Sequence, residues 1–117
     1  MWSSLETVVG WAARTLDMPA STYPLAQDSY PFAVVNRTGG ECAYPHDYPR
    51  YTVQVWTESD AEGESYAFDA ALALPSIVDE DERINAVGVA EITQLGFIDG
   101  GGFVWQVGFD LATNINQ

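Results

Sequence analysis

The sequence contains no lysine, and its 17 acidic residues face only four arginines, so the 117-residue chain carries a formal net charge of -13. Tight binding to a phosphate backbone needs a basic face, which argues against a protein that reads nucleic acid. An acidic surface repels phosphate, however, and lets DNA pass beside it without binding. The simpler alternative is that the charge only serves solubility.

Cysteine and histidine occur once each, as Cys42 and His46. A single cysteine excludes an intramolecular disulfide and leaves too few ligands for a structural zinc site, and it is typical of a reducing compartment. A thiolate and imidazole pair is conceivable here, but catalysis also needs an oriented third group and a pocket. We therefore expect two bystanders, no enzyme, no cofactor and no metal.

Long apolar runs are missing as well. The longest uncharged runs span about ten residues, half of what a membrane-spanning helix needs. The start of the chain lacks a basic segment followed by an apolar one, so it does not resemble a secretory signal. We expect no membrane partner, and a product that stays in the cytoplasm where it is made.

What the chain does contain is enough apolar material to fold. Hydrophobic residues make up 47% of the sequence and aromatic residues 13%, which excludes a disordered chain despite its charge. A chain of this length buries most of its apolar surface in one core. We expect a single domain over residues 1–117.

The stretch Arg50–Thr57 alternates between apolar and polar residues and is rich in β-branched and aromatic side chains, so it predicts a central β-strand. Residues 31–37 predict a second strand before it. The central strand is predicted to place Tyr51, Val53 and Val55 on one face and Thr52, Gln54 and Trp56 on the other.

Residues 38–49 join these two strands by a loop that is too long for a tight hairpin, and long ordered loops are often functional. Gly39 and Gly40 permit unusual backbone angles in it. Arg37 and Arg50 flank the loop, and a planar guanidinium suits a paired contact with a carboxylate at an interface. The alternative for these arginines is a local bridge to Asp47 or Glu41.

Two helices are predicted. Ser3 and Glu6 have the spacing of a capping box, so a helix should begin near Ser4. Its apolar stripe consists of Leu5, Val8, Val9, Ala12 and Leu16. Ser59 and Asp60 are good caps for a second helix over residues 64–74, which Pro75 should end. Residues 18–30, rich in polar residues and proline, predict an ordered surface loop.

The last third of the chain predicts two more strands. Residues 84–95 predict one strand with a bulge at Gly88. This strand is predicted to place Val87, Val89 and Leu95 on one face and Ile84, Ala86, Ala90 and Ile92 on the other. Residues 103–111 predict an amphipathic strand after a glycine turn at 100–102, which lacks the lysine and helix of a phosphate loop. The acidic run 79–82 predicts a solvated loop, and residues 113–117 a frayed end.

The predicted order is helix, strand, strand, helix, strand, strand. This order indicates an α+β fold with one four-stranded, mostly antiparallel or mixed sheet and both helices on one face. The other face would then leave Trp56 and the second apolar row of residues 84–95 without cover. A neighbouring copy of the chain would supply it.

With these residues in view, the chain resembles the tail terminator proteins of long-tailed bacteriophages. The likeness covers roughly residues 31–111 and lies in Pro-Phe-Ala-Val-Val at 31–35, Arg-Thr-Gly-Gly at 37–40, Asp-Tyr-Pro-Arg at 47–50, the strand ending at Trp56, the alanine-rich helix and the final strand. The chain departs from the family in its lack of lysine.

The resemblance implies a hexameric ring at the head-proximal end of the tail tube, assembled in the host cytoplasm and carried in the virion. Such a ring stops tube polymerisation, contacts the tail tube protein and a head-completion or connector protein, and lets genomic DNA pass through its lumen without specific binding. The interface is predicted to include Arg37, Gly39, Gly40, Asp47, Arg50 and Trp56.

Three alternatives stay open. A related neck or head-completion protein would share the size, the ring symmetry and the acidity. A monomeric acidic inhibitor or DNA mimic would need regularly spaced surface carboxylates, whereas those of this chain cluster in its predicted loops. An enzyme is the weakest alternative, because the sequence contains no catalytic constellation.

Overall fold

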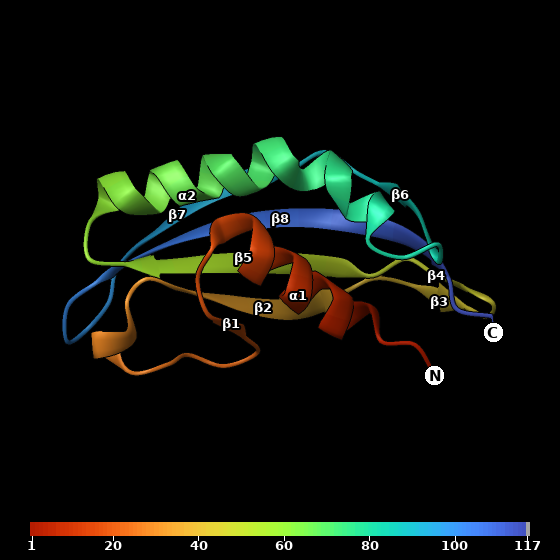
Figure 1. Cartoon of the computed structure of the whole chain (residues 1–117), viewed down its shortest axis with the longest axis horizontal. Coiled ribbons are helices and arrows are strands. Elements are labelled where there is room, and N and C mark those ends of the chain that lie inside the picture. The colour runs from red at the N-terminus through yellow and green to blue at the C-terminus, as the bar shows by residue number, and fades with distance from the viewer. Residues whose placement is uncertain (117) are drawn as a thin grey trace.

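The computed structural model describes residues 1–116 and has an α+β fold, in which two α-helices lie on an eight-stranded mixed sheet (Figure 1). The predicted fold class is confirmed, but the predicted count of four strands is wrong. The four long strands are β2 (Phe32–Gly39), β5 (Arg50–Thr57), β7 (Glu91–Phe97) and β8 (Phe103–Asn114). The four short ones are β1 (Ala20–Ser21), β3 (Cys42–Ala43), β4 (His46–Asp47) and β6 (Ile84–Val87).

The extra strands lie inside segments that were predicted as loops or as one strand. β1 pairs in parallel with β2 and makes the sheet mixed. The predicted loop over residues 18–30, which contains β1, also contains a short 3-10 helix, η1 (Gln27–Ser29). β3 and β4 form a hairpin within residues 38–49. Strands of two residues carry no periodicity, so a pattern of alternation cannot reveal them.

The predicted strand over residues 84–95 is two strands, β6 and β7, which both pair with β8. Gly88 lies in the break between them rather than at a bulge, and the bulges fall after Ile84 and after Gln94. The break changes which residues face the core. Ile84 is buried, at 5% exposed, whereas Val89 in the break is 93% exposed. The predicted division of residues 84–95 into two continuous faces is therefore wrong.

Both helices begin where the sequence places their caps. Ser3 Oγ accepts a hydrogen bond from the Glu6 amide at the start of α1 (Ser4–Leu16), and Ser59 Oγ accepts one from the Glu62 amide at the start of α2 (Asp60–Ala73). The second helix thus begins earlier than residue 64. The α-helix ends just before Pro75, but the chain continues as a 3-10 helix, η2 (Leu74–Asp79).

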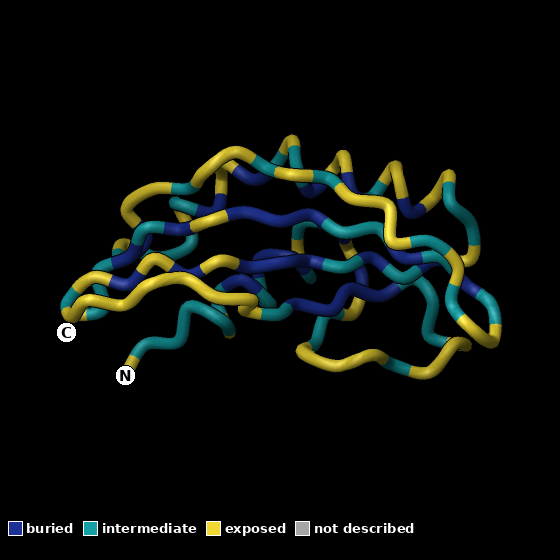
Figure 2. The backbone as a smooth tube through the Cα atoms, turned by 180° about the vertical axis from the view of Figure 1, so that it is seen from behind, coloured by how far each residue is buried: buried dark blue, intermediate teal, exposed yellow. Residues whose placement is uncertain are grey.

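The core lies between the helices and one face of the sheet. Tyr51, Val53 and Val55 all point into it, as predicted, and each is at most 1% exposed. Figure 2, which shows the sheet from behind, has its buried backbone along β2, β5 and β8. No helix within residues 1–116 is long and apolar enough to cross a membrane.

The face without helices covers its own aromatic residues. Trp56 stacks on Phe32 with ring centroids 5.3 Å apart, and Phe32 lies 5.5 Å from Tyr30. Trp56 Nε1 also donates to Gln54 Oε1 at 3.2 Å. Cover from a neighbouring copy is therefore not required for Trp56, and Ile84 of the second apolar row is buried within its own subunit.

The end of the chain is held rather than frayed as far as Ile115. Thr113 is 1% exposed, and its Oγ1 donates to the backbone oxygen of Asp47 at 2.9 Å. The Ile115 amide donates to the Pro45 oxygen at 2.8 Å. The predicted fraying is therefore wrong for these residues, and Gln117 lies outside the described residues.

Tyr51 links this core to a pH dependence. Burial raises the pKa of its phenol, while the hydrogen bond with Ser4 Oγ, at 2.5 Å, lowers it by less. The unfolded chain ionises this phenol first, so the contribution of Tyr51 to the free energy of unfolding should be constant below about pH 10 and fall above it. Tyr51→Phe should cost about 1 kcal/mol at neutral pH and reduce that alkaline fall.

Urea unfolding between neutral pH and pH 11 measures both effects. Tyr23→Phe is the matched control, since the Tyr23 side chain is exposed. An alkaline fall of the same size in Tyr51→Phe would show that other groups cause it.

Candidate functional site

The predicted functional loop is an ordered hairpin at the end of the molecule that also carries both termini (Figure 1). β3 pairs with β4, and β4 pairs with the last residues of β8, so the hairpin continues the sheet on the β5 side of that strand. The Tyr48 amide donates to the Glu41 oxygen at 2.9 Å and closes the base of the hairpin.

Arg37 and Asp47 form the bridge within the subunit that was left open as an alternative. The guanidinium donates to both carboxylate oxygens, at 2.7 and 2.9 Å, and its Nε donates to the Gly39 oxygen at 3.1 Å. The Asp47 hydrogen bond is the main reason why the pKa of Arg37 is raised. This pair ties the hairpin to β2, with the Asp47 carboxylate largely buried.

Gly39 and Gly40 have different surroundings. Gly40 has φ +104°, and a Cβ there would overlap the Tyr48 carbonyl oxygen, so only glycine lets the two sides of the hairpin approach. A Cβ on Gly39 would meet open space. Gly39 has room for a side chain but holds φ +153°, which strains other residues, whereas Gly40 is fixed by both its backbone angle and the close approach of Tyr48.

Arg50 lies on the opposite face of the sheet from Arg37. Arg37 pairs across the strands with Tyr51, which faces the helices, so the neighbouring Arg50 points to the uncovered face. Its guanidinium lies 3.4 Å from carboxylates of Asp110 and Glu91, both exposed, and not beside Asp47 or Glu41.

The six predicted interface residues thus form no single patch. Arg37, Gly39, Gly40 and Asp47 are together at the hairpin, and Arg50 lies behind them. Trp56 is six residues further along an extended strand, about 20 Å away. The sequence suggested one interface because these positions lie close in the chain, but strand alternation and length separate them.

Cys42 and His46 are both exposed in the hairpin and pair with Asp47 and Ala43, not with each other. Within residues 1–116, no three or more His, Cys, Asp or Glu side chains are grouped closely enough to hold a metal ion. The role expected for these two residues stays a prediction.

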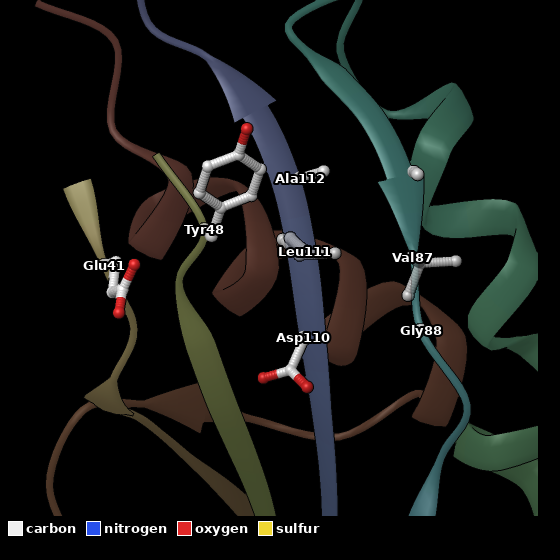
Figure 3. Close-up of a pocket in the computed structure, with 8 residues that line it drawn as sticks. Glu41, Tyr48, Val87, Gly88, Asp110, Leu111 and Ala112 are labelled. Atoms are coloured by element: carbon white, nitrogen blue, oxygen red, sulfur yellow. The ribbon is translucent and has the colours of Figure 1, made fainter. Parts of the chain in front are cut away.

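Two surface features were not predicted from the sequence. The first is an open groove of about 480 Å³ between the hairpin and β6, with Glu41 and Tyr48 on one side and Val87 and Gly88 on the other (Figure 3). The second is the outer edge of β7, where Leu95 is 48% and Phe97 67% exposed. The groove was invisible because its walls come from three distant segments. The exposed edge was hidden because the apolar pattern of residues 84–95 suggested burial.

Each of the four arginines forms an ion pair with a carboxylate of its own subunit. Arg14 pairs with Glu80 and Arg83 with Asp81, in addition to the pairs of Arg37 and Arg50. These pairs engage five of the 17 acidic residues, so twelve carry a charge that no arginine balances. The surface is therefore strongly acidic.

The two central arginines should differ in what they contribute to stability. Arg37→Ala leaves the buried Asp47 carboxylate without its partner and should lower the free energy of unfolding by about 2 kcal/mol. Arg50→Ala removes an exposed pair and should cost under about 1 kcal/mol. Equilibrium urea unfolding at neutral pH measures both, and equal losses would contradict the difference in burial.

Comparison with known proteins places the chain in no family. No protein-family model matches it, and no curated protein sequence does. What the chain does must therefore be argued from its own residues and their geometry.

Proposed function

We propose that this chain is a structural protein of a long-tailed bacteriophage. Six copies form a ring on the head-proximal end of the tail tube, end its polymerisation and present a surface for joining to the head. The partners are further copies of the chain, the tail tube protein and a head-completion or connector protein. The two-helix α+β fold supports the proposal, because it has the four main strands and the element order of the resemblance.

The free edge of β7 carries the proposal. Within residues 1–116, β7 pairs only with β8, and its outer edge has no strand beside it. Proteins usually protect such edges with charged side chains, yet residues 92–98 are uncharged and expose Leu95 and Phe97. An edge of this kind favours pairing with another chain.

The opposite edge of the sheet offers a partner. Among residues 1–116, β1 pairs with β2 only at Ala33 and Val34, and β5 is the one strand beside the rest of β2. Successive strands β7, β8, β5 and β2 are antiparallel, so β7 and β2 run in opposite directions. A rotation about an axis along the strands therefore sets β7 of one copy antiparallel to β2 of the next, which is the head-to-tail contact of a closed ring.

Charge supports this edge as the contact. Subunits of charge -13 repel each other, and the uncovered sheet face adds Glu91 and Asp110, whereas the edge from residue 92 onward is neutral. The ring contact is therefore proposed at the edge of β7 and not across the uncovered face. A ring of such subunits would let DNA pass through its lumen without binding it.

Leu95→Lys tests the edge directly. A charge at this position should prevent assembly, which light scattering detects over a concentration series with and without purified tail tubes. Leu72→Lys is the matched control, because Leu72 is an exposed leucine on the outer side of α2. It should assemble like the wild type.

Two results would overturn the ring. One is a wild-type protein that stays monomeric at high concentration and does not bind tail tubes. The other is a Leu95→Lys variant that assembles normally.

Arg50→Ala tests the hairpin end of the sheet in a terminator-deficient phage. The variant should give overlong tails or tails that fail to join heads, while the melting temperature of the isolated protein stays the same, because its ion pairs are exposed. Arg14→Ala, which removes another arginine with an exposed side chain, is the control. Normal tails from Arg50→Ala would remove Arg50 from the interface. If the wild-type chain restores a phage that lacks its neck protein and not one that lacks its terminator, the chain is the alternative, a head-completion protein.

A further inference from the structure

The groove between the hairpin and β6 is a preformed feature of the isolated subunit. One wall is held by the hydrogen bond from the Tyr48 amide to the backbone oxygen of Glu41, at 2.9 Å. The other is held by the hydrogen bond from the Gly88 amide to the backbone oxygen of Asp110, at 2.8 Å. Strand β8 crosses the floor between them (Figure 3). A ligand would not have to order these walls when it binds.

The groove combines three kinds of surface. Glu41 and Asp110 contribute carboxylates, and Tyr48 contributes an aromatic ring that is 47% exposed. Small apolar residues, Ala86 and Ala112 among them, line the rest. This combination matches a long cationic side chain, whose aliphatic stem packs on apolar surface while its head meets carboxylates and an aromatic face.

Asp110 is able to accept a further donor. Its two oxygens lie 3.4 and 3.5 Å from Arg50, which is long for a charge-assisted hydrogen bond, and the carboxylate is 60% exposed. Glu41 takes part in none of the four arginine pairs. The groove therefore offers more negative charge than its own subunit neutralises.

We propose that this groove binds an arginine side chain from a protein other than a second copy of this chain. A second copy has no lysine and only four arginines, and two subunits of charge -13 repel each other. Two carboxylates are too few for a calcium site, which takes six to eight oxygen ligands. The partner thus presents an arginine on a basic surface.

The site is measurable on the isolated protein and does not depend on the ring. The probe is N-acetyl-arginine methylamide, titrated into the 15N-labelled chain by NMR. Saturable shifts are expected at the amides of Tyr48, Gly88, Asp110 and Ala112. The neutral analogue N-acetyl-citrulline methylamide, which has nearly the same shape, should give none.

Two variants separate the groove from the general acidity of the surface. Ala86→Trp fills the groove without changing the net charge and should abolish saturable binding, since Ala86 is exposed and tolerates a larger side chain. Tyr48→Ala should weaken binding about three- to fivefold through loss of the cation–π contact. Tyr44→Ala, on the same hairpin but outside the groove, should bind like the wild type.

Any of three results would overturn the proposal. They are shifts scattered over the acidic surface without saturation, equal binding of the citrulline analogue, and unchanged affinity in both Ala86→Trp and Tyr48→Ala. The 15N spectra also show whether each variant is folded. Ala86→Trp lies in β6 and Tyr48→Ala lies between β4 and β5, so the two variants alter opposite walls of the groove.

Discussion

Hydrogen bonding along both edges of β8 is the interaction on which the rest of the structure depends. Gly108 pairs with Thr52 of β5 on one side and Glu91 of β7 on the other, and Thr113 pairs in the same way with Asp47 of β4 and Ile84 of β6. The helices pack on the buried side chains of this strand, such as Val107 and Phe109. The hairpin and β6 are thereby held on either side of it, which creates the groove.

Charge divides the surface into parts with different uses. Because every arginine is paired within its own subunit, the remaining carboxylates face solvent without a balancing cation. Contacts between copies are then favoured only where charge is absent, as along the outer edge of β7. Ion pairs with another protein are favoured only if that protein is basic. The same excess of acid would thus limit both any association between copies and the choice of other partners.

Local signals in the sequence were reliable where one short segment decides the outcome. Ser3 and Ser59 cap their helices as predicted, because a cap depends only on the next three residues. The core face of β5 was also predicted correctly, since Tyr51, Val53 and Val55 alternate without interruption. The prediction for residues 84–95 was wrong, because the break at Gly88 and two bulges change the alternation in a way that depends on pairing with β8.

The sequence by itself determined the α+β class, the positions of β2, β5 and β8, the helix caps and the excess of negative charge, since each follows from composition or from spacing within one segment. Only the tertiary structure decided the partners of Arg37 and Arg50, the free edge of β7 and the groove of Glu41, Tyr48 and Asp110. These features join residues that lie far apart in the chain or on opposite faces of a strand. Their geometry depends on strand order and register, which the periodicity of a single segment does not contain.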